Sequence, residues 1–211
     1  MIAAFVLAAA RIGSATDAEI AFARDAKKIG QWSAFRKWAD RDAVMFAPHA
    51  VWARTFLKPL KDPPRSISWR PAQSFVSCDA RTAVNTGPWF TQDHALGGYF
   101  TMIWQRTPAG WRWVYEGGIP APVEKASGPT ARRASCDGDA PGPPITPPPM
   151  LGRERTIAGP QDAGRGLSAD KTLGWDWKVS ARGARTLRVF LWTGGRYAKV
   201  IDALTPPPKR K

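Results

Sequence analysis

Two side chains capable of acid–base chemistry adjoin predicted strands within the first 118 residues of this 211-residue chain. His49 follows a proline that ends a short predicted strand, where a neutral imidazole could act as a base at pH 7. Because no carboxylate stands at a fixed spacing from it, a surface role for His49 is favoured. Glu116 follows an aromatic run, so its carboxyl either enters a buried interior or pairs with Arg106 or Arg112 on the outer face of the strand. The outer-face ion pair is the favoured interpretation.

The two cysteines, Cys78 and Cys136, allow one disulfide. In an oxidising compartment they could pair and tie the later linker to the sheet; otherwise one is a buried thiol and the other an exposed one. The chain has two histidines and no CxxC pair, which argues against a metal site. The sequence also contains no glycine-rich phosphate loop and no Ser-His-Asp spacing, so no cofactor is predicted.

The formal charge of +14 arises from 31 Lys and Arg residues against 17 Asp and Glu residues. The basic residues are spread along the sequence, and the densest group is the terminal Lys209-Arg210-Lys211. Such a surface favours anionic partners in general. Since no nucleic-acid-reading motif accompanies the charge, nucleic acid is not a predicted partner.

The first ten residues are apolar and rich in alanine, and small residues precede a potential cleavage after Ala15. This pattern is typical of a secretory signal peptide, although the basic segment that normally opens one is missing. It predicts a periplasmic or secreted protein. The alternative is that these residues begin a buried helix of a cytoplasmic protein. The apolar run is too short to span a bilayer and no later segment is long enough, so no transmembrane segment is predicted.

Hydrophobic periodicity places helices before strands in the first half of the chain. A capping box from Thr16 to Glu19 begins a helix whose apolar stripe runs from Phe22 to Phe35, with Gly30 marking a bend and the end of the helix at 38–40. The other expected elements are a strand at 42–48, a helix at 51–60, and strands at 67–76, 82–89, 99–106 and 111–115. This order predicts an α+β domain with its helices packed on one face of the sheet.

The character of the sequence changes near residue 119, where prolines become frequent and apolar periodicity disappears. Order is expected to return with three strands, at 172–179, 186–192 and 196–202. Three strands are marginal alone, so the face that carries Trp175 and Trp177 is expected to pack on the first domain. The predicted divisions are a signal peptide over 1–15, an α+β domain over 17–118, a Pro/Gly-rich linker over 119–165, a small β segment over 166–204 and a flexible basic tail over 205–211.

The chain contains eleven tryptophans, most of them in the first domain. Any single one is expected to belong to the core between helix and sheet. As a set, some are expected to line an apolar pocket for a small apolar, flat or cyclic ligand. The predicted pocket-lining residues are Phe46, Trp52, Trp69, Trp89, Met102, Trp104 and Trp113.

Three segments carry a resemblance to a known family: ADRDAVMFAP at 39–48, SFVSCDARTAVNTGPW at 74–89 and GYFTMIWQRTPAGWRWVYEGG at 98–118. In order and spacing, residues 17–118 resemble the nuclear transport factor 2-like superfamily, most closely its SnoaL-like and ketosteroid-isomerase-like branches. The resemblance implies a cone-shaped, curved antiparallel sheet wrapped round a long N-terminal helix, with a pocket at the open end. It also implies a homodimer that forms through the sheet.

The resemblance does not carry the steroid-isomerase mechanism with it. In those enzymes an aspartate that acts as the base precedes the proline of the first strand, and here that position is Ala47. The first hypothesis is therefore an exported small-molecule-binding protein. The second is an isomerase, dehydratase or hydrolase that uses His49 or Glu116 as acid or base. The third is a dimeric interaction module, because this fold hosts many unrelated functions.

Overall fold

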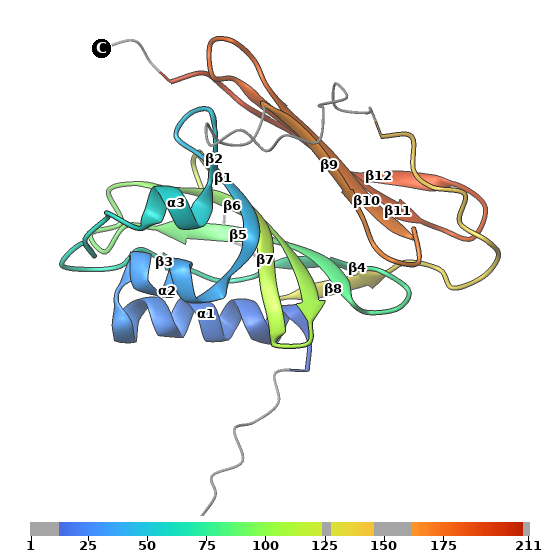
Figure 1. Ribbon diagram of the computed structural model, residues 1–211, viewed down its shortest axis with the longest axis horizontal. Coiled ribbons are helices and arrows are strands. Elements are labelled where there is room, and N and C mark those ends of the chain that lie inside the picture. Colours follow the sequence, from blue (N-terminus) through green and yellow to red (C-terminus); the bar gives the residue numbers. More distant parts are fainter. Residues whose placement is uncertain (1–12, 124–127, 146–161, 209–211) are drawn as a thin grey trace, which may run out of the picture.

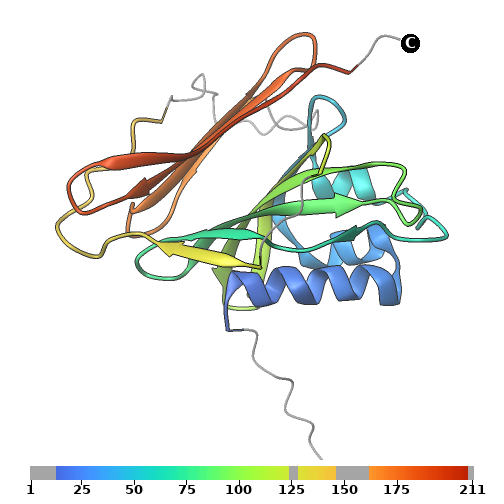
Figure 2. The ribbon, with the colours of Figure 1, turned by 180° about the vertical axis from the view of Figure 1, so that it is seen from behind.

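The computed structural model describes residues 13–123, 128–145 and 162–208, arranged in three layers. Two helices cover one face of a curved eight-stranded sheet, and a four-stranded sheet lies on its other face (Figure 1). The view from behind shows the same order of layers (Figure 2). Helices segregated to one face of a sheet define an α+β fold, so the predicted fold class is confirmed.

The first layer consists of α1 (Ala15–Ile29) and α2 (Gln31–Trp38). Ser14 caps α1: its hydroxyl accepts a hydrogen bond from the Asp17 backbone N–H, and the Asp17 carboxylate accepts one from the Ser14 backbone N–H, both at 3.1 Å. The capping box therefore begins at Ser14 and not, as predicted, at Thr16. The helix breaks at Gly30, whose φ of 101° lies in the region that favours glycine. This break is the bend that the sequence predicted.

The large sheet is mixed rather than antiparallel throughout. Its strands are β1 (Ala39–Phe46), β2 (Ala50–Trp52), β3 (Ser68–Trp69), β4 (Gln73–Val76), β5 (Thr82–Phe90), β6 (Gly97–Thr107), β7 (Gly110–Pro120) and β8 (Thr130–Arg133). The order is β2-β1-β7-β6-β5-β4-β8, with β3 paired to β5. The parallel pairs are β1 with β7 and β4 with β8. Neither pair is joined by a hairpin, so no short turn forces the strands to be antiparallel.

The segment predicted as a helix at 51–60 divides into β2 and a short helix, α3 (Ala53–Leu57). Val51 pairs with Met45 across a hairpin, and this pairing overrides the helical pattern of its first residues. The segment predicted as a linker supplies β8, whose four residues are all exposed. An exposed edge strand lacks the apolar alternation by which strands are found in a sequence.

The small sheet has four strands, β9 (Ala163–Leu167), β10 (Leu173–Val179), β11 (Arg185–Trp192) and β12 (Tyr197–Thr205), where three were predicted. The additional strand, β9, has the sequence AGRGL, which carries no apolar alternation. Its glycines have a steric role, because a Cβ atom at Gly166 would lie 2.0 Å from the Trp175 ring and one at Gly164 would lie 2.6 Å from the Trp177 ring. The missing side chains make room for the two indoles.

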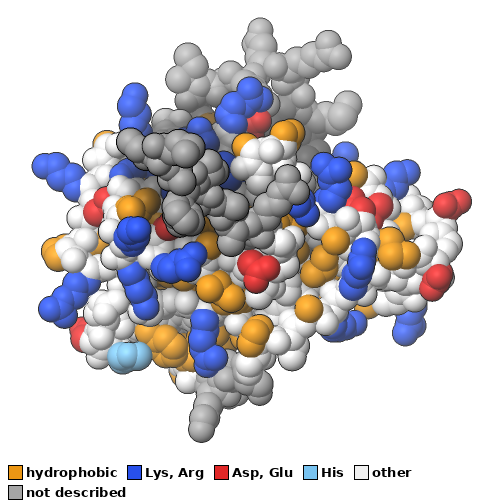
Figure 3. Space-filling model, turned by 90° about the horizontal axis from the view of Figure 1, so that it is seen from below, with side chains coloured by type: hydrophobic (Ala, Val, Ile, Leu, Met, Phe, Trp, Pro, Cys, Tyr) orange, Lys and Arg blue, Asp and Glu red, His pale blue; other side chains and the backbone are white. Residues whose placement is uncertain are grey.

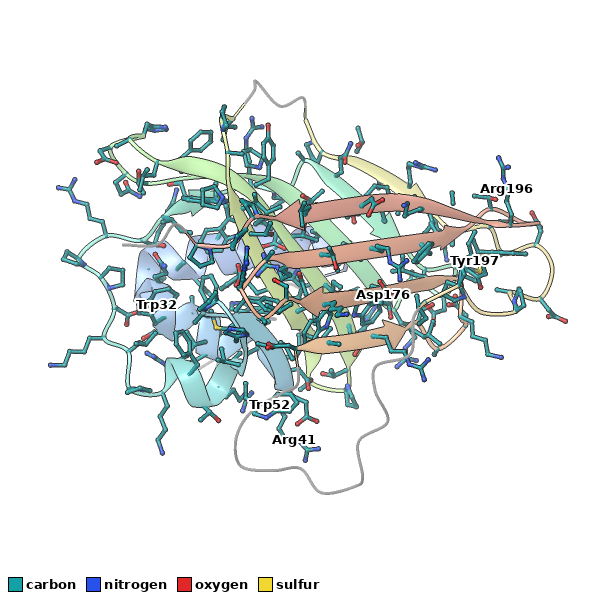
Figure 4. All side chains as sticks on the ribbon, turned by 90° about the horizontal axis from the view of Figure 1, so that it is seen from above. Trp32, Arg41, Trp52, Asp176, Arg196 and Tyr197 are labelled. Atoms are coloured by element: carbon teal, nitrogen blue, oxygen red, sulfur yellow. A yellow bond between two sulfur atoms is a disulfide. The ribbon has the colours of Figure 1, made fainter. Side chains whose placement is uncertain are left out.

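The two sheets pack face to face through a second hydrophobic core. Trp175 and Trp177 of the small sheet join Val84 and Ile103 of the large sheet in this core, as the sequence predicted. In Figure 4 the small sheet is seen from above with the large sheet beneath it, and Asp176 lies on the outward side. The face through which the resemblance implies a homodimer is therefore covered by the chain's own C-terminal strands. A dimer would have to use another surface.

Cys78 and Cys136 form a disulfide with their Cα atoms 5.2 Å apart. The bond joins the turn between β4 and β5 to the segment that follows β8. The same turn contacts the small sheet, because the backbone N–H of Cys78 donates a hydrogen bond to Thr172 Oγ1 at 2.9 Å. The disulfide thus holds the large sheet, β8 and the start of the small sheet together.

Candidate functional site

A cavity of about 330 Å³ lies between α2 and the inner face of the large sheet. Its walls come from α2, the segment that leads into β3, and strands β3, β5, β6 and β7. The lining residues are Phe35, Ile67, Trp69, Trp89, Phe100, Met102, Glu116, Gly118 and Pro120. Of the described residues that line it, Glu116 alone has a titratable side chain.

A β-bulge in β7 turns Glu116 towards this cavity. Trp104 pairs with Trp113, but the preceding residue, Ile103, pairs with Tyr115, so Val114 is an extra residue in β7. An extra residue reverses the alternation of faces beyond it. Tyr115 therefore faces the small sheet, and Glu116 faces the cavity. The favoured prediction for Glu116, an ion pair on the outer face, assumed uninterrupted alternation and was wrong.

The Glu116 carboxyl has no hydrogen-bond partner among the described residues, and the part of its surface that stays accessible faces the cavity. Desolvation raises its pKa from 4.5 to about 7, because the apolar surroundings disfavour the charged form. The positive charge of Arg185, on the opposite side of the sheet, opposes this rise. The acid is therefore close to the midpoint of its titration at neutral pH.

A second carboxyl, Glu19 of α1, lies behind the cavity wall and is fully buried. Its two oxygens accept hydrogen bonds from the indole N–H groups of Trp69, at 2.8 Å, and Trp104, at 2.7 Å. Burial raises the pKa of Glu19 to about 7, while these hydrogen bonds and one from Asn85 lower it. Trp69 also lines the cavity, so Glu19 fixes the orientation of one cavity wall.

The indole N–H of Trp89, one of the lining residues, is buried without a hydrogen-bond partner among the described residues, as are those of Trp111 and Trp113 in the core. A Cβ atom placed on Gly118 would lie 3.7 Å from the Trp89 nitrogen. The absence of a side chain at Gly118 therefore leaves space in this part of the cavity, where Glu116 also lies. Polar groups that are withdrawn from water are normally paired, so the Glu116 carboxyl beside this space suggests that something else completes it.

The predicted pocket residues divide into three groups. Trp69, Trp89 and Met102 line the cavity. Trp104 and Trp113 lie in the core behind it, each with an exposed fraction of 0%. The other two, Phe46 and Trp52, lie on the opposite face of the sheet and contact the core between the sheets.

His49 does not line the cavity. It lies in the turn between β1 and β2, where its Nδ1 is 2.6 Å from Oδ2 of Asp162, and both side chains are partly exposed. Asp162 also accepts a hydrogen bond from the backbone N–H of Ala50 at 3.1 Å. The histidine thus connects this turn to the segment that leads into β9. Ala47, at the position of the isomerase base, is exposed.

Sequence reasoning missed Glu19 as a site residue because it interpreted that carboxylate as part of a helix cap. The available signal was its spacing from Phe22, which places both side chains on one face of the helix. An acid on the apolar face of an amphipathic helix is buried unless the helix frays. Phe35 was identified only as part of the apolar stripe of the helix.

Among the described residues, no group of three or more His, Cys, Asp and Glu side chains is suited to hold a metal ion. No helix in the same ranges has the length and apolar character required to cross a membrane. Lys and Arg side chains are distributed over the face seen from below rather than gathered in one patch (Figure 3). The charge of the protein therefore does not mark a single binding surface on this face.

A scan against protein-family models finds no match for the chain, and neither does a search of the curated proteins. Among solved structures, the chain is similar to one described as a Ca/calmodulin-dependent kinase II association domain from Exiguobacterium sibiricum 255-15. The match has 15% sequence identity and a TM-score of 0.37, and covers 53% of this chain and 98% of that chain. Similarity at this level assigns neither an assembly nor an activity to this chain.

Proposed function

We propose that the chain is an exported small-molecule-binding protein with a nuclear transport factor 2-like fold. The observation that carries the proposal is the carboxyl of Glu116, which faces an apolar cavity without a partner from the described residues. A carboxyl that is part-buried among apolar walls loses hydration without gaining a protein partner, which costs free energy, so such an arrangement is better explained by a ligand than by folding. Helices packed against one face of a curved sheet, with a cavity between them, are what this fold would provide.

Export is supported by the disulfide between Cys78 and Cys136, since disulfides persist in oxidising compartments. The apolar start of the sequence points the same way. Residues 1–12, which contain most of the expected signal peptide, lie outside the described residues. Ser14 and Ala15, the last two residues of that expected peptide, cap and begin α1, so a cleavage after Ala15 would remove the helix cap.

Binding is better supported than catalysis because Glu116 has no acid–base partner in the cavity. General acid–base reactions usually need a second group to hold or polarise the reacting atoms. His49, the other candidate for acid–base chemistry, lies in a turn and does not line the cavity. Glu116 as the sole acid or base of an isomerase, dehydratase or hydrolase is the alternative, and loss of turnover in Glu116→Gln would support it.

The proposal can be tested by native mass spectrometry of the protein purified from an export-competent bacterial host. We expect a small-molecule adduct on the wild type that is lost on denaturation. Gly118→Val would place a side chain in the cavity and remove the adduct. Gly195→Val is the matched control: it makes the same substitution in an exposed turn, where a Cβ atom has nothing within 4 Å. An adduct that Gly118→Val retains in full would contradict binding in this cavity.

A second candidate function is that of an interaction module. Because the small sheet covers the outer face of the large sheet, assembly would use an edge. Among the described strands, β12 pairs only with β11, and Leu204 on β12 has an exposed fraction of 66%. Unpaired edges with exposed apolar side chains are sites of strand addition. Light scattering of wild type and Leu204→Lys over a range of concentrations tests this idea, since a dimer through β12 should dissociate in the variant.

A further inference from the structure

We propose that the ligand of the cavity is a small organic cation, an alkyl- or arylammonium ion, whose charge lies against Glu116 and whose apolar part contacts the aromatic walls. The inference rests on the proposed function and names the ligand class for the same cavity. Three observations support it: the unpaired carboxyl, the aromatic walls and the placement of the nearest protein cation.

The nearest positive side chain cannot serve as the partner of Glu116. Arg185 of β11 lies between the two sheets, where its Nη2 donates to the carbonyl oxygen of Gly118 at 3.1 Å and to Thr205 Oγ1 at 3.2 Å. Its guanidinium group also lies 4.2 Å from the centre of the Phe46 ring. These contacts hold Arg185 on the far side of the large sheet. An ionised Glu116 therefore requires a cation that enters from the cavity.

The walls around the carboxyl are suited to such a cation. Four aromatic side chains, Phe35, Trp69, Trp89 and Phe100, line the cavity. The faces of aromatic rings carry partial negative charge and attract ammonium groups, most strongly where water is excluded. A quaternary or tertiary ammonium ion also has an apolar surface that such walls can cover. A carboxylate within an aromatic cavity thus complements both the charge and the shape of an ammonium ion.

The titratable groups around Glu116 favour a cation over an anion. Glu19, from α1, is a second carboxyl whose charge repels that of Glu116. Tyr115, from β7 itself, is fully buried, and its pKa is raised by that burial, so it stays neutral. Among the described residues, Arg185 of β11 is the positive group that acts on Glu116, and the sheet separates it from the cavity. An anionic ligand would meet the Glu116 carboxyl, with the buried Glu19 behind the wall, and no lining cation from the described residues.

The size of the cavity restricts the ligand further. A volume of about 330 Å³ lies near the lower end of the range for small-molecule sites. The ligand should therefore be about the size of one ring with a short side chain.

A pair of matched probes tests the inference. Benzyltrimethylammonium and 2,2-dimethylpropylbenzene have nearly the same shape and differ in whether nitrogen or carbon bears the three methyl groups. Titrations followed by tryptophan fluorescence should show the cation binding at least about tenfold more tightly at pH 8. The charge of this cation does not depend on pH, so any change in its affinity reports on the protein. We expect its affinity to rise from pH 5.5 to pH 8 as Glu116 ionises.

Two variants test whether the preference for the cation arises from Glu116 and whether both probes bind in the cavity. Glu116→Gln keeps the size of the side chain, so it should remove the preference for the cation and its pH dependence while the neutral probe binds as before. Gly118→Val should weaken both probes alike. Circular dichroism and thermal unfolding check that each variant is folded.

The outcomes separate the inference from the proposed function. Equal binding of the two probes, or tighter binding of the neutral one, would overturn the cation inference and leave the proposed function standing. Failure of both probes would also overturn the cation inference, and an adduct on the native wild type would still support the proposed function. If neither probe binds and the native wild type carries no adduct, both the cation inference and the proposed function are overturned.

Discussion

The carboxyl of Glu116 occupies a place on β7 where an apolar side chain would stabilise the fold more. A buried acid without a hydrogen-bond partner is expensive when ionised, so the folded state favours its protonated form. Protonation of the carboxyl and binding of a cation each reduce the free-energy cost of holding a negative charge among apolar walls. At the residue scale, the proposed function therefore makes this site a carboxyl that a bound ligand neutralises.

The pKa of Glu116 gives a pH dependence of stability with a definite sign. Its pKa is 4.5 as a free side chain and about 7 in the folded state, so between these values the folded state binds more protons than the unfolded state. The contribution is fully present below pH 4.5 and is lost as the pH rises through 7. We expect the melting temperature of ligand-free wild type to fall from pH 5 to pH 8 by more than that of Glu116→Gln. Parallel curves for the two proteins would contradict the assignment.

Glu19 is the contrasting case, because its oxygens are already paired with Trp69 and Trp104. Glu19→Ala leaves both indole N–H groups buried without an acceptor and opens a cavity, which should cost about 3 kcal/mol or more of unfolding free energy. Glu19→Gln keeps the volume and one acceptor, so it should cost about 1 to 2 kcal/mol. Urea unfolding at pH 6 measures both. Equal, near-zero losses would mean that Glu19 does not hold the indoles.

At the scale of elements, the positions of most strands could be predicted from the sequence, but the face on which Glu116 lies could not. The alternation of Trp111 and Trp113 correctly indicates one inward face of β7. The extra residue at Val114 reverses that alternation, and nothing in the local sequence marks it, because valine suits any strand position. Bulges depend on the register with a neighbouring strand, which is a property of the folded sheet.

The same limit explains why β9 was missed and the bend at Gly30 was found. The two glycines of β9 are selected by the indoles of Trp175 and Trp177, which belong to another strand. Gly30, in contrast, interrupts a helical stripe within one segment, where its effect is visible locally. Of the candidate site, the lining tryptophans could be identified by type, but their division between cavity and core depends on contacts between distant segments.

Gly30 also carries a prediction at this scale. Its φ of 101° disfavours any other residue, and a Cβ atom there would lie 2.3 Å from Cγ of Asp62. Asp62 accepts a hydrogen bond from the backbone N–H of Ser33 at 2.9 Å and so stabilises the start of α2. Gly30→Ala should therefore destabilise the protein by about 2 kcal/mol or more. A matched Gly195→Ala should change the unfolding midpoint little, and equal midpoints for both variants would contradict this account of the bend.

At the scale of the whole molecule, the small sheet and the disulfide close the outer side of the large sheet. The loop between Cys78 and Cys136 spans 58 residues, so the bond should stabilise the fold by about 4 kcal/mol through the unfolded state. We expect the Cys78→Ser/Cys136→Ser double variant to lose most of this stability in guanidinium unfolding. A reducing agent should lower the midpoint of the wild type to that of the variant and leave the variant unchanged. If the reducing agent has no effect on wild type, the bond is not formed.

The central claim is that Glu116 lies part-buried in an apolar cavity. It is tested most directly by a carbon-13 NMR titration of the side-chain carboxyl of Glu116 in ligand-free protein, assigned by its absence from the Glu116→Gln spectrum. A midpoint near pH 7 is expected, since burial raises the pKa to about 7. Addition of benzyltrimethylammonium should then lower the midpoint. A midpoint near 4.5, unchanged by the cation, would mean that the carboxyl is in solvent and that the cavity site does not exist as described.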